Sequence, residues 1–433
     1  LHLRGILKSP SEVEQGMPSA SSIEEAQRRR AYMYESFTFC FNISIENIFW
    51  EILSRQSLYM LVWCLLFLSH PLLRTNSHIC TLQQVTIDRC FCTLIGFSFI
   101  FVMMLMTDCK EDNARLVSYI PGVSPLYRED FPTFLLVEDR SDENLKTMEL
   151  QFDLLKDCKA VVINSFYELE KEAFDALQGE SLSVFGVGPL LSSSKQGHGS
   201  SRHDAEFCSM AQDGDENVER DECLKWLDKQ SKHSVLYVSF GTLLNPAPDN
   251  MKGIAMALRE SKQPFLWAFK LKSFYDRASG KFTEISSVGE MLPELFLEDT
   301  EGYGILVPWV PQQEVLAHPS VGAFLSHCGW NSTLESVSMG VPMIPLPMAS
   351  DQTTNSKYVV DVWKVGVRLK LNKSGKVDSA DLMRVLHIVF HDEEGQELRK
   401  RAGKLKEAAR RAFEIGSNDD TNRFCEALMH TIS

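Results

Sequence analysis

The 433-residue sequence lacks the cysteine spacing of a zinc site or of a thiol redox motif. It contains 11 cysteines, an odd number, and none of them stands in a Cys-x-x-Cys pair. Cys90 and Cys92 form the one close pair, and no further ligands follow at zinc-site spacing. We therefore expect reduced thiols, as in a cytoplasmic protein.

Long basic runs are also missing. The formal net charge is -14, and a basic cluster such as Arg28–Arg30 contains only three positive residues. Because proteins bind nucleic acid through clustered Lys and Arg side chains, the sequence predicts no nucleic-acid partner. Hydrophobic residues make up 44% of the chain and charged residues 24%, as in an ordinary globular protein. The length suggests roughly two or three domains.

Two runs of 18 residues, 56–73 and 90–107, contain no Asp, Glu, Lys or Arg. This length is at the lower limit for a transmembrane helix. His70 and Pro71 weaken the first run as a membrane span, and the second run fits either a membrane helix or a buried core segment. Membrane association through either run is an alternative that we do not favour. The first 30 residues are polar, so no secretory signal peptide is predicted.

From residue 111 onward, short apolar strands alternate with helical stretches. The segments AVVIN (160–164) and SVLYVSF (234–240) are strand candidates. Such alternation is typical of α/β proteins with doubly wound parallel sheets. The expected parts are an atypical apolar segment (1–110), a remainder of an N-terminal domain (111–190), a Ser-, Gly- and charge-rich linker (191–220) and a C-terminal domain (221–433).

The segment HCGWNSTLES (327–336) combines a strand end, a glycine turn and a helix start. Ser332 with Glu335 three residues later fits a capping box, which predicts that a helix begins at Asn331 or Ser332. Gly340 is expected to end this helix before a strand in VPMIPLP. A strand, a glycine turn and a helix start can present backbone N–H groups to a phosphate. Spacing alone does not distinguish such an anion site from a simple helix cap.

A longer stretch, Trp309 to Gln352, resembles the 44-residue donor-binding signature of plant UDP-dependent glycosyltransferases (family 1, inverting). The match includes the opening W-x-P-Q, the H-C-G-W-N-S core, the Glu three residues after the Ser and the closing D-Q, all at the family spacing. With shorter similarities such as 118–135 and 161–170, the resemblance covers about residues 112–430. It implies a GT-B type α/β fold of two facing Rossmann-like domains, of which the N-terminal one is truncated or altered here.

The resemblance also implies which residues bind the donor. Trp309 would stack on uracil, Gln312 would pair with the polar edge of the base beside the main chain of Val310, and Glu335 would accept the ribose hydroxyls. A core role is the alternative for Trp309 and a helix cap for Glu335, while Trp330 would either contact the donor or simply wall the pocket. The donor-binding set consists of Thr242, His327, Asn331 and Ser332 at the diphosphate, Asp351 and Gln352 at the sugar, Trp309, Val310, Gln312 and Glu335 around the nucleoside, and Trp330.

The implied reaction is inverting transfer of a hexose, expected to be glucose from UDP-glucose, to a hydroxyl or carboxyl of a small lipophilic acceptor such as a phenolic or terpenoid. No metal or other cofactor is expected, because the protein itself would stabilise the leaving diphosphate. The family's His base stands in a Gly-His-x-x-Pro turn, and no such motif precedes residue 110. His2, His70 and His78 stand in other settings, and Asp108 is a weak candidate for the Asp that orients the base.

Two interpretations therefore remain. The chain is either an active transferase or a UDP-sugar-binding remnant that lacks the catalytic base. The first residue is Leu, which is consistent with a missing upstream segment.

Overall fold

The computed structural model describes eleven stretches of the chain. Asp108, Thr242, the apolar run 56–73 and most of the predicted linker lie outside them, so the predictions for these residues stay predictions. The described residues are 91–94, 116–136, 160–179, 183–189, 191, 216–241, 245–269, 274–276, 281–283, 288–413 and 423.

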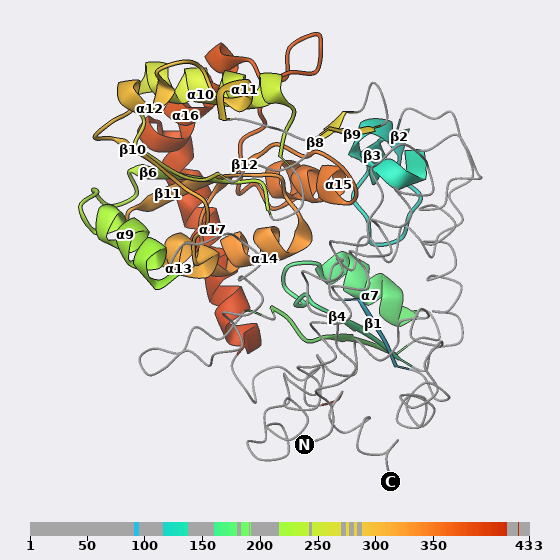
Figure 1. Ribbon diagram of the computed structural model, residues 1–433. Coiled ribbons are helices and arrows are strands. Elements are labelled where there is room, and N and C mark those ends of the chain that lie inside the picture. The colour runs from blue at the N-terminus through green and yellow to red at the C-terminus, as the bar shows by residue number, and fades with distance from the viewer. Residues whose placement is uncertain are drawn as a thin grey trace, which may run out of the picture. The chain divides into compact units, whose positions relative to one another are not determined.

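A five-stranded parallel sheet organises the C-terminal part of the chain (Figure 1). Its strands lie in the order β10-β7-β6-β11-β12, and every pair is parallel. The strand predicted at 234–240 is β6, and the strand predicted to end before the glycine turn of segment 327–336 is β11. The bounds are β6 Val235–Ser239, β7 Phe265–Ala268, β10 Gly304–Val307, β11 Val321–Ser326 and β12 Met343–Pro345.

Helices cover both faces of this sheet, because successive side chains of a strand point to opposite faces. Leu236 and Val238 of β6 pack into a core with α10 and α16, whereas Val235 and Tyr237 pack with α9 and α13. Figure 1 shows these two pairs of helices on opposite sides of the sheet. The helices are α9 Glu216–Asp228, α10 Pro248–Ser261, α11 Val288–Met291, α12 Phe296–Asp299, α13 Gln312–Ala317, α14 Trp330–Met339, α16 Ser379–His391 and α17 Glu393–Phe413.

The strand order reverses at the centre of the sheet. From β6 the chain continues outward through β7 to β10, then returns to the other side of β6 to form β11 and β12. In open α/β sheets, ligands bind beyond the carboxyl ends of the strands at such a reversal. The topology therefore places the expected site beyond Ser239 and Ser326, the last residues of β6 and β11.

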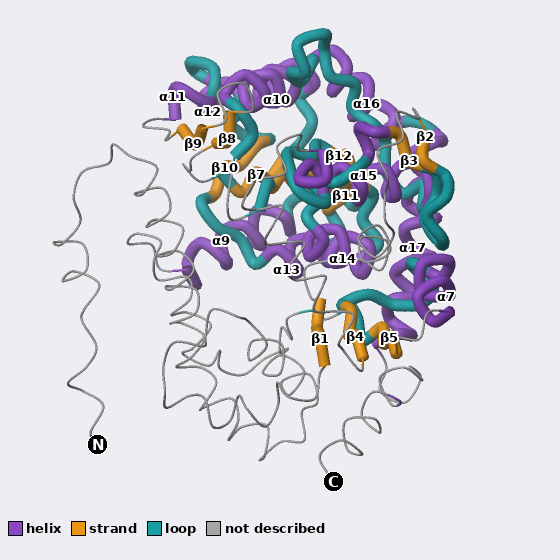
Figure 2. Tube along the Cα trace, turned by 90° about the vertical axis from the view of Figure 1, so that its right-hand side faces the viewer, coloured by secondary structure: helices purple, strands orange, loops and turns teal. Residues whose placement is uncertain are grey.

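A second parallel sheet consists of β1, β4 and β5, which lie side by side in Figure 2. The strand predicted at AVVIN is β4, and helix α7 leads from it to β5. β1 lies near the start of the apolar run 90–107, and the other residues of that run are outside the described stretches. The bounds are β1 Phe91–Leu94, β4 Ala160–Ile163, α7 Lys171–Gly179 and β5 Ser183–Gly186.

Within the described stretches, no helix combines the length and the apolar character needed to span a bilayer.

The remaining described elements are short. They are the antiparallel pairs β2 Leu116–Val117 with β3 Leu126–Tyr127 and β8 Phe274–Asp276 with β9 Lys281–Thr283, the single turns η2 Arg128–Asp130 and η3 Thr133–Leu136, helix α15 Gln352–Lys357 and the π-helical turn η5 Tyr358–Val362.

Replacing the fully buried Phe265 by Ala tests the core between β7 and the helices above it. The Phe265 ring lies 5.9 Å from the Phe296 ring and 6.3 Å from the Tyr303 ring, measured between centroids. We expect the free energy of unfolding to fall by about 3–5 kcal/mol, because the substitution leaves a cavity. Urea unfolding followed by tryptophan fluorescence measures this loss. The control is Leu297→Ala, which removes a side chain that is 56% exposed and should cost less than about 0.5 kcal/mol. Equal losses in the two variants would contradict this assignment of the core.

Candidate functional site

His327 stands at the reversal of the sheet, directly after β11. Its imidazole lies between two glycines. A Cβ on Gly241, which follows β6 with φ +76°, would lie 2.9 Å from the ring, and a Cβ on Gly329 would lie 2.6 Å from Nε2. Both distances are too short for a real side chain. The two glycines therefore leave the space that the imidazole occupies.

Helix α14 begins immediately after this turn. Its N-cap is Gly329 and it ends at Gly340, which has φ +73°. The predicted sequence of strand, glycine turn, helix and Gly340 stop is confirmed, and β12 follows as expected. The helix begins at Trp330, one residue earlier than predicted.

The predicted capping box at Ser332 and Glu335 is wrong. Ser332 is the third residue of α14 and not its N-cap, and no side chain caps Gly329. The two side chains instead accept hydrogen bonds from a neighbouring helix. Gln312 Nε2 of α13 donates to Ser332 Oγ at 3.0 Å and to Glu335 Oε2 at 2.5 Å. The spacing that suggested a local cap thus serves a contact between two helices.

This contact is part of a longer hydrogen-bond network. Tyr237 Oη of β6 donates to Gln312 Oε1 at 2.9 Å, and Gln313 Nε2 donates to Glu335 Oε1 at 3.1 Å. The Tyr237 ring stacks on Phe324 of β11 with centroids 4.8 Å apart. Burial raises the pKa of Glu335, while the bonds from Gln312 and Gln313 oppose that rise. An ionised carboxylate accepts about four hydrogen bonds, so Glu335 keeps acceptor capacity beyond its two amide partners.

Asp351 ends the loop between β12 and α15, and Gln352 is the first residue of α15. Asn355 Nδ2 donates to Asp351 Oδ2 at 2.7 Å and to the Cys328 carbonyl at 3.0 Å, which ties this loop to the turn after β11. Burial raises the pKa of Asp351 to about 6. Gln352 Oε1 accepts the backbone N–H groups of Met348 and Ala349 at 2.8 and 3.0 Å. Because backbone N–H groups only donate, these bonds fix the orientation of the amide.

The described residues of the predicted donor set follow strands that run in the same direction. Half-buried Trp309 and buried Val310 follow β10, His327 follows β11, and Asp351 follows β12. Because the strands are parallel, their carboxyl ends meet at one edge of the sheet. Ser332 and the exposed Asn331 occupy the first turn of α14 at this edge.

Trp330 is the exception. Only 2% of its surface is exposed, and its Nε1 donates to the Asn164 carbonyl at 2.8 Å. The ring packs in an apolar cluster with Phe166, Leu169 and Leu334. These contacts favour a structural role for Trp330, and its contact with the donor stays a prediction.

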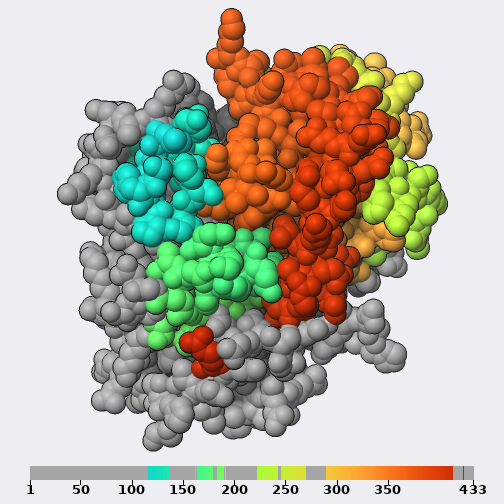
Figure 3. All heavy atoms as spheres, turned by 180° about the vertical axis from the view of Figure 1, so that it is seen from behind, coloured from blue at the N-terminus to red at the C-terminus, as the bar shows by residue number. Residues whose placement is uncertain are grey.

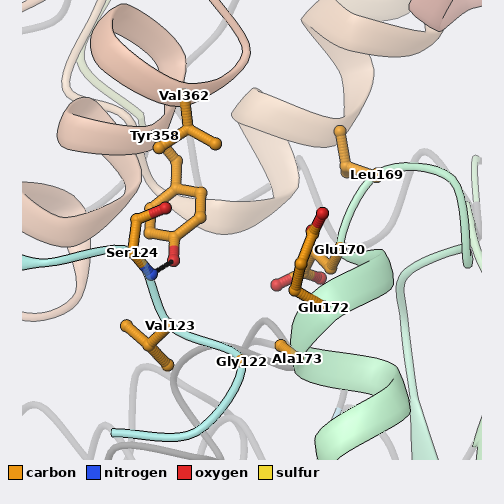
Figure 4. A pocket seen from close by; sticks show the side chains of 9 residues that line it. All are labelled: Gly122, Val123, Ser124, Leu169, Glu170, Glu172, Ala173, Tyr358 and Val362. Atoms are coloured by element: carbon orange, nitrogen blue, oxygen red, sulfur yellow. Dashed lines mark hydrogen bonds between the residues drawn. The ribbon is translucent and has the colours of Figure 1, made fainter. Parts of the chain in front are cut away.

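A separate pocket of about 290 Å³ is lined by none of the predicted donor residues (Figure 4). Tyr358 lies on one side, where its Oη accepts the Ser124 N–H at 2.8 Å, and Glu170 and Glu172 lie on the other. Over the described stretches, no group of three or more His, Cys, Asp or Glu side chains is arranged to hold a metal ion.

Comparison with known proteins identifies close relatives. The family model described as "UDP-glucoronosyl and UDP-glucosyl transferase" matches residues 209–403. UDP-glycosyltransferase 75C1 of Solanum lycopersicum is 37% identical over 310 residues, which is 70% of this chain and 62% of the relative. The chain thus spans less than two thirds of that protein.

Solved structures show the same fold. UGT2 of Phytolacca americana, in complex with UDP-2fluoro-glucose and pterostilbene, is 26% identical with a TM-score of 0.66. A UDP-glucosyltransferase from Polygonum tinctorium capable of glucosylating indoxyl is 30% identical with a TM-score of 0.65. Each match covers 82% of this chain and 74% of the other. The predicted α/β fold of the GT-B type, with Rossmann-like domains, is confirmed.

Two tryptophan substitutions separate packing from ligand binding. Trp330→Phe should lower the free energy of unfolding by about 1–3 kcal/mol, because it leaves the buried Asn164 carbonyl without its donor. It should change the affinity for UDP less than twofold. Trp309→Ala removes a half-buried ring. It should weaken UDP binding at least tenfold and lower the free energy of unfolding less than Trp330→Phe does. Urea unfolding and calorimetric titration measure the two effects. A larger loss of UDP affinity in the Trp330 variant would restore Trp330 to the donor site.

Proposed function

Because the chain belongs to the family of UDP-glucosyl transferases, we propose that it transfers a hexose, glucose from UDP-glucose, to a small lipophilic acceptor. The acceptor group is a hydroxyl or a carboxyl, as in phenolics and terpenoids of plant secondary metabolism. The anomeric centre is inverted. The observation that supports this proposal best is the convergence of Trp309, His327 and Asp351 on the carboxyl edge of one parallel sheet.

In this proposal, the nucleoside binds at the β10 side of the edge. Trp309 stacks on uracil, Gln312 and the main chain of Val310 meet the edge of the base, and Glu335 accepts the ribose hydroxyls. Support comes from the network that joins Tyr237, Gln312 and Glu335, because it fixes the Glu335 carboxylate before any ligand arrives. A pre-oriented acceptor binds with a smaller loss of conformational entropy.

The diphosphate meets the start of α14. The first turn of a helix carries unpaired N–H groups and the positive end of the helix dipole, so Asn331 and Ser332 offer donors to an anion. His327 adds a side chain held between two glycines. Thr242, which follows Gly241, belongs to the same proposed subsite. These groups stabilise the charge of the departing UDP without a metal ion.

The sugar binds between Asp351 and Gln352. In the transfer step, the acceptor oxygen forms a bond to the anomeric carbon, the bond from that carbon to the UDP oxygen breaks, and the acceptor proton passes to a base. We assign no residue of this chain as that base, and Asp108 stays a weak candidate for its orienting partner. The alternative function is binding of a UDP-sugar without transfer.

The domain limits are also part of the proposal. We assign residues 1–110 to an atypical N-terminal segment, 111–190 to the acceptor-binding domain, 191–220 to the linker and 221–433 to the donor-binding domain. The two parallel sheets support this division, since β4 and β5 precede the proposed linker and β6 to β12 follow it. Buried free thiols at Cys223 and Cys328 are consistent with a cytoplasmic location.

Acceptor-dependent release of UDP distinguishes a transferase from a binding remnant. The full chain is mixed with UDP-glucose and a panel of phenolic and terpenoid alcohols and acids, and free UDP is measured over time. We expect release above the acceptor-free rate for at least one acceptor. Gly329→Ala is the damaged control, because the new Cβ displaces the His327 ring and should lower both UDP binding and release at least tenfold. UDP-glucose binding without release from any acceptor would favour the remnant.

The affinity for UDP-glucose should increase as the pH rises through about 6. The buried Asp351, with its pKa raised to about 6, accepts sugar hydroxyls best when ionised, so affinity at pH 5 should be about tenfold lower than at pH 7. Asp351→Asn should abolish that part of the change. The stability of the fold changes with pH in the opposite direction. Between pH 3.8, the usual pKa of an Asp carboxyl, and about pH 6, Asp351 binds more protons in the native than in the unfolded protein. The free energy of unfolding therefore falls as the pH rises through this range. Calorimetric titration of both proteins from pH 5 to 7 measures the difference, and parallel profiles would contradict the role of Asp351.

A further inference from the structure

We propose that Thr133 is a positioning residue for the sugar, because it fixes the loop that carries Asp351 and Gln352. This inference rests on the proposed function and adds a specificity determinant to it from the N-terminal part of the chain. Thr133 lies 217 residues before its partner Ser350. In the space-filling view, the cyan segment 116–136 abuts the orange surface that includes this loop (Figure 3).

Thr133 pairs with both backbone groups of Ser350. The Ser350 N–H donates to Thr133 Oγ1 at 2.8 Å, and the Thr133 N–H donates to the Ser350 carbonyl at 3.0 Å. Two threonines that follow Ser350 make further hydrogen bonds to the same N-terminal segment. Thr353 Oγ1 donates to the Phe131 carbonyl at 2.7 Å, and Thr354 Oγ1 donates to the Asp130 carbonyl at 2.6 Å. Four hydrogen bonds therefore hold the loop and the start of α15 against residues 130–133.

Ser350 needs such a partner because its backbone is strained. Its φ is +60°, a left-handed conformation that residues with a side chain rarely adopt. A strained residue keeps its conformation only when its surroundings fix it. Ser350 directly precedes Asp351, so a relaxation of its backbone would turn the Asp351 carboxylate and move the Gln352 amide.

The internal contacts of the loop do not replace this anchor. Gln352 Oε1 closes the loop on itself by accepting the N–H groups of Met348 and Ala349, but it does not contact Ser350. The Ser350 side chain and Asn355 Nδ2 both hydrogen-bond to the Asp351 carboxylate, but neither bond involves the Ser350 backbone. Among the described residues, the Thr133 hydroxyl is the side-chain group that accepts the Ser350 N–H, so its effect should concern the sugar and not the nucleoside. The network around Gln312 and Glu335 has no bond to it.

The test compares UDP with UDP-glucose on the full chain. Thr133→Val keeps the shape and the main-chain bond but removes the hydroxyl. We expect it to weaken UDP-glucose binding roughly 5- to 10-fold, the usual effect of one lost hydrogen bond, and to change UDP binding less than twofold. Thr133→Ser restores the hydroxyl and should bind both ligands as the wild type does. Should the Val variant fail to fold, Thr133→Ala tests the same loss with a smaller side chain.

Thr300→Val is a matched control, because it also removes a threonine hydroxyl that makes a hydrogen bond. Thr300 Oγ1 donates to the Phe296 carbonyl at 2.8 Å at the end of α12. Thr300→Val should therefore leave the ratio of the UDP and UDP-glucose affinities unchanged. Hydrogen exchange of residues 346–354 in the ligand-free protein provides a readout that needs no ligand. Exchange should be faster in Thr133→Val than in the wild type and normal in Thr133→Ser.

The outcomes separate this inference from the proposed function. If the wild type binds neither UDP nor UDP-glucose, the proposed function fails. If it binds both and Thr133→Val leaves the ratio of affinities unchanged, or weakens both ligands equally, only the positioning role of Thr133 is wrong. Faster exchange of the loop without a change in that ratio also overturns it, because the anchor would then be purely structural.

Discussion

The close approach of the His327 imidazole to Gly241 and Gly329 constrains the rest of the site. It brings the turns after β6 and β11 together at the point where the strand order reverses. A side chain at either glycine would push the ring away, and the start of α14 could then not follow β11 so tightly. The N–H groups of α14 and the strand ends share one edge because neither Gly241 nor Gly329 places a Cβ against the ring.

A second set of contacts joins segments that are far apart in sequence. Two indole N–H groups reach the same stretch after β4, where Trp330 donates to the Asn164 carbonyl and Trp363 to the Leu169 carbonyl. Tyr358 accepts the Ser124 N–H, so α15 and η5 are anchored along their length. Buried donors and acceptors cost free energy when they lack partners, so each such bond also specifies the packing of these segments. The apolar cluster around Phe166 surrounds the two indole rings.

Much of this arrangement could be predicted from the sequence, and the failures have a common cause. Short apolar strands, the glycine turn and the Gly340 stop are encoded locally, within a few residues of where they act. Ser332 and Glu335 were misjudged because a spacing of three residues fits a helix cap as well as two neighbouring acceptors on one helix face. The donor that decides between them, Gln312, is 20 residues away from Ser332. The role of Trp330 stayed open at the level of sequence for the same reason, since its partner Asn164 is 166 residues away.

The contacts divide the proposed donor site into two parts with different supports. The nucleoside end is held by Tyr237, Gln312 and Glu335, which all belong to the C-terminal sheet and its helices. The sugar end depends on Ser350, whose strained backbone is fixed by Thr133 from the N-terminal part. A change in the N-terminal part should therefore affect the binding of the sugar more than the binding of the base. If the proposed function holds, such a change would alter the binding of the sugar more than the binding of UDP, because the two ends of the donor would not be held by the same residues.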